Sequence, residues 1–319
     1  MLKKLWFMLL LALIALPVHA EEAVQAVEEE LPYLLTVAAS GDMETLNAML
    51  QAGTNPNTKD ADGITALMYA ARKDQVEAAR ALLKSGAKVN AQDSGGWTPL
   101  MFAAKKNHVA TAKLLLEHGA DPKVRDGSGW SALGMAATSG FSEMIGLLIK
   151  HGVDPNSKSD DGKSVLMYAA KNGDVPTINI LLDNGASTFL RDRFGATALM
   201  YAAREGNTAA MTALMDRGAK VDSIDHHKWT ALTWAVSKSQ VEAARELIAR
   251  GGDVNGKDSE GTPLLQIAVV NKDADMVRLL LDSGAKVKAR DQYGLTAYVY
   301  ALKGKDPEIV RLIVDAGGK

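Results

Sequence analysis

Hydrophobic residues recur with helical spacing in short segments along most of the chain, and residues 93–125 show the pattern clearly. A first apolar stripe has residues three and four apart: Leu100, Ala103 and Ala104. A second stripe follows after a polar interval: Val109, Ala112, Leu115 and Leu116. Such spacing predicts two short amphipathic helices, each of which buries one face against its neighbours.

The residues around the two stripes indicate where each helix begins and ends. Thr98 is suited to cap the first helix, and Pro99 suits its first turn, where a missing N–H costs nothing. Residues 105–107 (Lys-Lys-Asn) end that helix, and residues 118–119 (His-Gly) close the second with a left-handed glycine. Residues 93–96 (Asp-Ser-Gly-Gly) are typical of a turn. The unit is therefore a helix, a turn, a second helix and an extended, hairpin-like loop.

The same unit returns every 33 residues. One column, meaning residues at the same place in successive units, is aspartate: Asp60, Asp93, Asp126, Asp192, Asp225, Asp258 and Asp291, with Ser159 as the exception. A second column is glycine: Gly63, Gly96, Gly129, Gly162, Gly195, Gly261 and Gly294, interrupted by Lys228. A fixed period of this length predicts a solenoid, in which each unit buries its apolar face only against its neighbours.

Specific segments of the unit resemble the ankyrin repeat closely. They are Gly96-Trp97-Thr98-Pro99-Leu100, Ala103-Ala104, Leu114-Leu115-Leu116 and Gly119-Ala120-Asp121. The resemblance covers about residues 32–319 and implies an all-α solenoid of helix-turn-helix units joined by β-hairpin-like loops. It divides the chain into an N-terminal cap (32–59), units starting at 60, 93, 126, 159, 192, 225 and 258, and a C-terminal cap (291–319).

Two features depart from the family pattern. The family usually has a histidine that ties neighbouring units together, whereas this chain has a different column there: Met68, Met101, Gly134, Met167, Met200, Thr233, Gln266 and Val299. We interpret these residues mainly as interior packing. The unit starting at 225 is predicted to open first, because Lys228 replaces the turn glycine and Gly251-Gly252 loosens a helix end.

The N-terminus reads as a targeting segment rather than as part of the fold. Two lysines, about 12 apolar residues, Pro17 and the sequence Val18-His19-Ala20 predict a signal peptide cleaved after residue 20. A retained membrane anchor is the alternative, but a bilayer span needs roughly 20 apolar residues. Residues 21–31 form an acidic N-terminal segment. We expect an exported protein, periplasmic or alternatively extracellular, without stable membrane insertion after cleavage.

Bulk composition excludes several classes of site. The formal net charge is −2, so no global basic field indicates nucleic-acid binding. The chain has no cysteine, which excludes disulfides, thiolate metal ligands and thiol catalysis. The absence of cysteine and of Asn-x-Ser/Thr sequons favours a bacterial periplasm over a eukaryotic secretory route.

By the family resemblance, the loop tips line the concave side of the solenoid. Three tryptophans share one tip column: Trp97, Trp130 and Trp229. Phe194 and Tyr293 lie close by, at the third residue of their units. Spaced aromatic residues are typical anchors of protein interfaces. The alternative is that each tryptophan simply packs on the neighbouring tip.

A basic column lies at the end of the first helix of several units. It includes Arg72, Lys105, Lys171 and Arg204, with Lys73, Lys106 and Lys238 beside it. Cations are favoured at any helix C-terminus, so a purely structural origin remains open. Alternatively, the column forms a basic ladder that matches an acidic, extended surface of a partner protein.

The sequence offers little for catalysis. It contains no phosphate-binding glycine motif and no His-Glu-x-x-His zinc motif. His226-His227 in a loop tip is a weak candidate for metal, alone or with the methionines. Acidic residues at turns usually satisfy the backbone. No cofactor, metal or catalytic residue is predicted.

We therefore expect a non-catalytic scaffold that binds one partner protein through its concave face and is monomeric alone. An inhibitor or immunity protein and an accessory factor for an envelope or stress-response enzyme are two forms of this hypothesis. A secreted effector that binds host proteins is the first alternative. A metal-binding or enzymatic protein that uses His226 and His227 is a remote one.

Overall fold

The computed structural model describes residues 32–319, so the predicted signal peptide and acidic segment (1–31) lie outside the described residues. Within residues 32–319, eighteen helices form helix-turn-helix pairs, which confirms the predicted all-α solenoid. The first helices of the pairs are α3 (Tyr33–Ser40), α5 (Ala66–Arg72), α7 (Pro99–Lys105), α9 (Ala132–Ser139), α11 (Val165–Asn172), α13 (Ala198–Glu205), α15 (Ala231–Ser237), α17 (Leu264–Val270) and α19 (Ala297–Gly304). The second helices are α4 (Met43–Gln51), α6 (Val76–Lys84), α8 (Val109–Glu117), α10 (Ser142–Lys150), α12 (Val175–Asp183), α14 (Thr208–Asp216), α16 (Val241–Ala249), α18 (Ala274–Asp282) and α20 (Pro307–Asp315).

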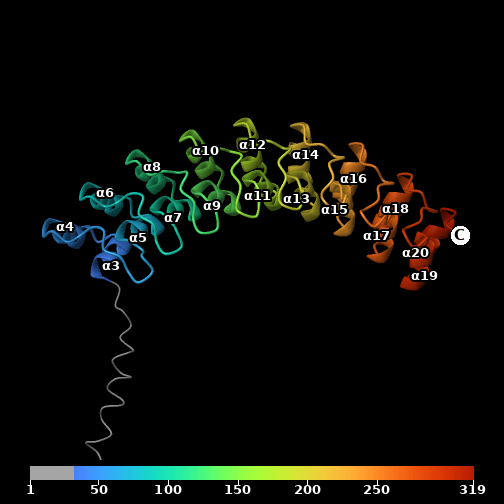
Figure 1. The fold of residues 1–319 in the computed structure, drawn as a ribbon, viewed down its shortest axis with the longest axis horizontal. Coiled ribbons are helices and arrows are strands. Elements are labelled where there is room, and N and C mark those ends of the chain that lie inside the picture. The colour runs from blue at the N-terminus through green and yellow to red at the C-terminus, as the bar shows by residue number, and fades with distance from the viewer. Residues whose placement is uncertain (1–31) are drawn as a thin grey trace, which may run out of the picture.

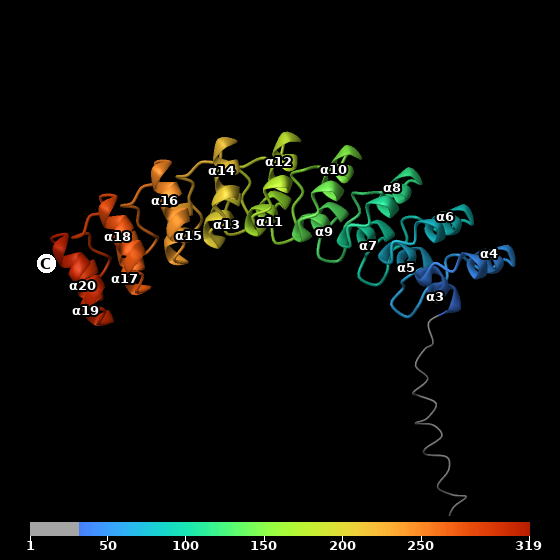
Figure 2. The same cartoon turned by 180° about the vertical axis from the view of Figure 1, so that it is seen from behind.

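The pairs stack side by side into an arch (Figure 1). Each helix packs against its own partner and against its counterparts in the adjacent units, so the core is one continuous layer of apolar side chains. First helices and loop tips lie on the inner, concave side, and second helices lie on the outer side, as the view from behind also shows (Figure 2). The exposed face of the first helices is therefore the concave surface.

Hydroxyl residues cap the first helices as the sequence predicts. The Thr98 side chain accepts the N–H of Met101 at 3.3 Å, with Pro99 in the first turn. The methionine column contributes a second contact that sequence reasoning missed. In three units the thioether sulfur accepts the N–H of the capping residue, at 3.3–3.4 Å: Met68, Met167 and Met200. These methionines thus pack in the interior and also close the caps.

Two other residues of the methionine column differ for identifiable reasons. Gly134 is required because a side chain there would overlap the ring of Trp130, which lies across α9. Gln266 is buried, and its amide donates to the carbonyls of Leu295 (2.8 Å) and Ala289 (3.3 Å). Gln266 is therefore a hydrogen-bonded tie between the last two units, the role that the resemblance described above assigns to a histidine.

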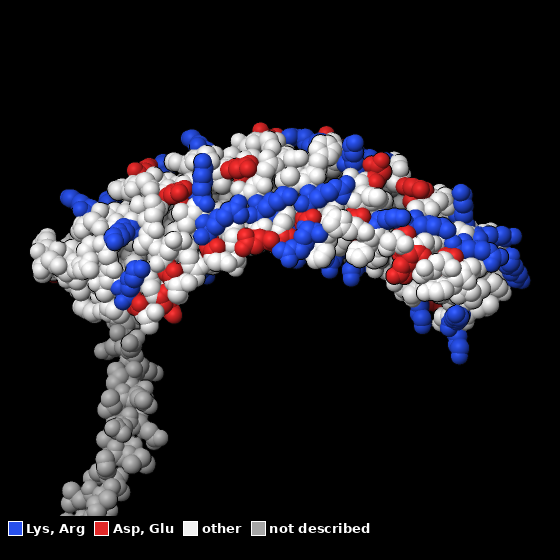
Figure 3. Space-filling model, viewed as in Figure 1, with Lys and Arg blue, Asp and Glu red and all other residues white. Residues whose placement is uncertain are grey.

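A line of basic side chains, here called the basic spine, runs along the solenoid axis. Its members immediately precede the aspartate column: Lys59, Arg125, Lys158, Arg191, Lys257 and Arg290. Each of the first five donates to the backbone carbonyl of the residue 33 places later in the next unit, for example Lys158 to Arg191 at 2.8 Å. Figure 3 shows basic side chains aligned along the arch in this manner. The spine joins units together, so its cations are already engaged by the backbone.

Lys228 occupies a left-handed turn that other units give to glycine. Its φ is 59°, and the equivalent glycines have φ between 74° and 82°. The turn still closes, because the Lys228 N–H donates to the Asp225 carbonyl at 3.1 Å. A side chain in this conformation is a local source of strain.

We expect Lys228→Gly to raise the free energy of unfolding by about 0.5–1 kcal/mol. Left-handed backbone costs a non-glycine residue roughly 1–2 kcal/mol, and the greater freedom of glycine in the unfolded chain offsets part of the gain. Hydrogen exchange of residues 225–257 measures the effect, and it also tests whether this unit opens first. The matched control is Gly294→Ala, where an added Cβ meets no atom within 4 Å. This control should lower the free energy of unfolding by a similar amount, through the left-handed backbone alone.

Asp174, like Asp273 in a later unit, interrupts a row of ties between units. At the equivalent place, Asn207 donates its amide to the carbonyls of Ala170 (3.1 Å) and Lys171 (2.8 Å) in the preceding unit. The side chain of Asp174 caps α12 through the Thr177 N–H, but its second carboxylate oxygen is buried without a partner. A carboxylate cannot donate to carbonyls, so this tie is missing.

Asp174→Asn is expected to stabilise the protein by about 1–2 kcal/mol, because an amide would donate where the carboxylate oxygen is now unsatisfied. The readout is the midpoint of urea unfolding at pH 7. Asn207→Asp is the reverse exchange and should cost a comparable amount. If neither change moves the midpoint, the buried oxygen is not a liability.

Candidate protein-binding surface

An aromatic column that sequence reasoning missed lies nine residues after each aspartate, on the exposed face of the first helices. Its aromatic members are Tyr69, Phe102, Tyr168, Tyr201, Trp234 and Tyr300. Phe102 and Tyr201 are buried, and the other four rings are half-buried. The aspartate column holds four of these rings. Asp192 accepts the Tyr201 hydroxyl at 2.7 Å and Asp225 accepts the Trp234 N–H at 3.0 Å, with like contacts at Tyr69 and Tyr300.

Each of these aspartates has a second role, as the sequence predicts. One oxygen of Asp192 accepts the N–H groups of Phe194 (2.8 Å) and Ala196 (2.9 Å) and so shapes the turn. The other oxygen anchors the ring on the helix. The same carboxylate thereby fixes the loop tip and the aromatic side chain relative to each other.

The three predicted tryptophans pack on this aromatic column. Trp97 lies 5.1 Å from Phe102, Trp130 lies edge-on at 4.9 Å from Tyr168, and Trp229 lies 6.1 Å from Trp234, measured between ring centroids. All three are half-buried. Phe194 and Tyr293 are exposed, at 55% and 74%, and project from the tips. The two exposed rings, rather than the tryptophans, offer free aromatic surface.

The predicted basic residues lie at the ends of the first helices. Arg72, Lys105, Lys171 and Arg204 occupy the last turns, and Lys73, Lys106 and Lys238 lie at or just beyond them. Two of the guanidinium groups stack on rings of the aromatic column, Arg72 over Tyr69 at 5.3 Å and Arg204 over Trp234 at 5.4 Å. Stacking leaves the in-plane N–H groups of arginine free to donate to an anion. In contrast with the basic spine, this column makes few contacts with the backbone.

Three of the predicted residues meet in one pocket between α11, α13 and α15. The pocket has a volume of about 250 Å³, and it contains Lys171, Arg204 and Phe194. Its other walls are Lys163, Met167, Tyr168, Tyr201 and Trp234. Small-molecule sites usually span roughly 300–1,000 Å³, so a pocket of this size suits one side chain of a larger partner. Figure 3 shows basic side chains at the inner edge of the arch near its middle. Trp97, Trp130, Trp229, Tyr293 and the remaining basic residues lie outside this pocket.

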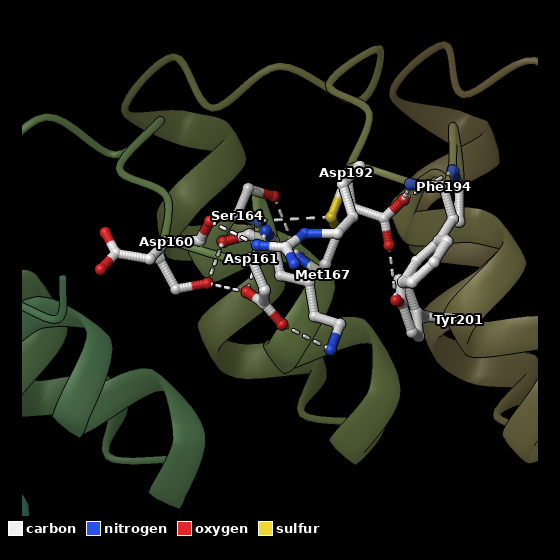
Figure 4. A network of polar contacts seen from close by, with 11 residues as sticks. Asp160, Asp161, Ser164, Met167, Asp192, Phe194 and Tyr201 are labelled. Atoms are coloured by element: carbon white, nitrogen blue, oxygen red, sulfur yellow. Dashed lines mark hydrogen bonds and ion pairs between the residues drawn. The ribbon is translucent and has the colours of Figure 1, made fainter. Parts of the chain in front are cut away.

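The pocket coincides with the one break in the aspartate column. Ser159 stands in place of aspartate. The carboxylate of Asp161, two residues later, accepts the N–H of Lys163 in this turn instead (Figure 4). One oxygen of Asp161 contacts the Ser159 hydroxyl and the Lys163 N–H, and the other binds the Lys163 ammonium at 2.7 Å. Asp161 therefore neutralises Lys163 and leaves Lys171 and Arg204 as the principal cations of the pocket.

The break also changes Tyr168. Within residues 32–319, this hydroxyl donates to no aspartate, unlike the hydroxyls of Tyr69, Tyr201 and Tyr300. Burial, followed by the charge of Asp161, raises the pKa of Tyr168. Burial and the bond to Asp192 raise the pKa of Tyr201 further. Both side chains are thus neutral hydrogen-bond donors at physiological pH.

Comparison with known families identifies the repeat. The model of ankyrin repeats (3 copies) matches residues 34–126, 119–192, 166–258 and 250–319. The chain belongs to the ankyrin-repeat family. Ankyrin repeats generally mediate protein–protein interaction and are typically non-catalytic, so the family supports protein binding as the general role. No curated protein matches the sequence.

None of the helices in residues 32–319 has the length and apolar character needed to cross a membrane. In the same residues, no three or more histidine or acidic side chains are grouped so that they could hold a metal ion. His226 and His227 are exposed in the tip of their unit, where the His226 N–H donates to the Phe194 carbonyl at 2.9 Å.

Proposed function

We propose that this protein is a non-catalytic scaffold of the bacterial periplasm that binds a partner protein through its concave face. The protein would hold, inhibit or assist this partner, for example an enzyme of the cell envelope or of a stress response. The observation that carries this proposal is the pocket in which Lys171, Arg204 and Phe194 converge with Tyr201 and Trp234. Aromatic side chains and arginine are the residue types enriched among the residues that dominate the binding energy of protein interfaces.

The shape of the arch supports an extended contact. First helices and tips of every unit face inward, so a bound segment can run along several units beyond the pocket (Figure 1). The main-chain bonds between tips, such as Gly127 N–H to the Gly95 carbonyl at 2.9 Å, hold this surface in shape before a partner arrives. Binding would then cost little free energy for ordering this surface.

Site-specific photo-cross-linking in the native cells tests the proposal. A photoreactive phenylalanine analogue replaces Phe194 on the concave side or, as the control, the exposed Lys113 on α8. We expect one partner protein to be trapped at 194 and not at 113, with both variants in the osmotic-shock fraction. Equal trapping at both sites, or none, would contradict a concave binding surface. Recovery of the protein only from culture fluid would favour the secreted-effector alternative.

A further inference from the structure

The irregular unit at 159 creates a group of hydrogen-bond donors that the regular units lack. In a regular unit the column aspartate accepts the hydroxyl of the tyrosine nine residues later, as Asp192 does for Tyr201. At 159 the side chain is a serine, and the nearby carboxylate of Asp161 is engaged by Lys163 at 2.7 Å. The Tyr168 hydroxyl therefore lies beside the hydroxyl of Ser159 instead of a carboxylate, so no charged acceptor within residues 32–319 engages this donor in the wall of the pocket.

Two cations lie beside this hydroxyl. Lys171 is one helical turn after Tyr168 on α11, so both side chains project from the same helix face. Arg204 is the equivalent of Lys171 on the adjacent helix α13, and neighbouring helices pack about 8–10 Å apart. Lys171 makes no ion pair within residues 32–319, and Arg204 has only the distant, exposed Glu205 at 3.9 Å. All three side chains line the same pocket.

We propose that this pocket binds a carboxylate side chain of an acidic, extended segment of the partner protein, with Tyr168, Lys171 and Arg204 as its donors. The inference rests on the protein-binding function proposed above and names the chemistry of the partner. The aromatic walls, Phe194, Tyr201 and Trp234, would contact the methylene groups of the same side chain. A carboxylate between two cations and a hydroxyl forms charge-assisted hydrogen bonds, which are the strongest kind available here.

Two substitutions remove the Tyr168 hydroxyl as a free donor, the first at constant charge and the second with an added negative charge. Tyr168→Phe deletes only the O–H group. Ser159→Asp restores the aspartate column, so the new carboxylate would take up the Tyr168 hydroxyl as Asp192 takes up that of Tyr201. Both variants should remain folded, because one is isosteric and the other restores the pattern of the remaining units. Tyr300→Phe is the matched control, since its hydroxyl is bound by Asp291 in the last unit at 2.7 Å.

The test measures fluorescence anisotropy of the purified protein with a labelled octapeptide that alternates glutamate and leucine. We expect Tyr168→Phe and Ser159→Asp each to weaken binding about tenfold or more, since a hydrogen bond to a charged group contributes about 1.5–3 kcal/mol. Tyr300→Phe and the wild type should bind alike, and a peptide with glutamine for glutamate should bind at least tenfold more weakly than the glutamate peptide.

Three results would overturn the inference. They are binding of both pocket variants within twofold of wild type, equal binding of the glutamine peptide, and displacement of the glutamate peptide by inorganic phosphate more readily than by sodium chloride of equal ionic strength. The last result would mark a site for free anions. If the pocket variants bind like wild type while cross-linking at 194 still traps a partner, only this inference fails. If cross-linking also fails, the proposed function fails with it.

Discussion

Reversing the charge of both cations of the pocket, by Lys171→Glu with Arg204→Glu, should lower the affinity for the glutamate–leucine peptide at least about 100-fold. Each substitution removes a charge-assisted hydrogen bond worth about 1.5–3 kcal/mol and places a like charge against the incoming carboxylate. Circular dichroism and urea unfolding should show a folded protein. Both side chains line the pocket, and neither belongs to the buried core.

A matched variant separates a local effect from a change in overall charge. Lys84→Glu with Lys113→Glu alters the net charge equally, on the exposed faces of α6 and α8. This variant should bind the peptide within about twofold of wild type at 0.15 M salt, where charges more than about 8 Å apart are screened. Equal loss of affinity in the two variants would mean that the peptide responds only to the net charge of the arch.

The repeat pattern predicted the fold correctly because most of its information is local. Caps such as Thr98, turn residues such as Asp93 and the apolar stripes all act within one unit or against its nearest neighbours. A solenoid contains few contacts of other kinds, so a single sequence can specify it.

The binding surface was only partly predictable. The aromatic column was visible at the same 33-residue period, with Tyr69, Tyr168, Tyr201 and Tyr300 in phase. Aromatic residues within an amphipathic helix usually belong to its buried face, so the pattern alone does not mark this column as a surface. Whether such a ring is buried or borders a groove depends on the tips of adjacent units, as with Trp130 against Tyr168.

The pocket itself could not be foreseen from the pattern. The sequence shows that Ser159 departs from the aspartate column, but not that Asp161 would replace it and bind Lys163. The sequence also gives two basic columns without distinguishing them. Only the structure shows that the spine, as at Lys158, is engaged by backbone carbonyls, whereas Lys171 is not.

Removing one aspartate should test how far the pocket depends on the turn behind it. We expect Asp192→Ala to lower the free energy of unfolding by about 3–5 kcal/mol, because three hydrogen bonds to a charged, buried acceptor are lost. Two of these come from the N–H groups of Phe194 and Ala196, and the third from the Tyr201 hydroxyl. Urea unfolding measures the loss, and hydrogen exchange shows whether it is confined to units next to residue 192.

Asp258→Ala is the matched comparison. Asp258 makes the same two turn bonds, to Glu260 (2.9 Å) and Thr262 (2.8 Å), but Ile267 stands where Tyr201 stands in the other unit. This variant should lower the free energy of unfolding by only about 1–2 kcal/mol, because Asp258 is half-exposed and anchors no aromatic ring. Asp192→Ala should also lower the affinity for the glutamate–leucine peptide severalfold, because Phe194 and Tyr201 both lose their anchor. Asp258→Ala should leave this affinity unchanged. Equal losses of stability would show that the bond between Asp192 and Tyr201 adds nothing, and unchanged peptide affinity would show that the pocket does not need it.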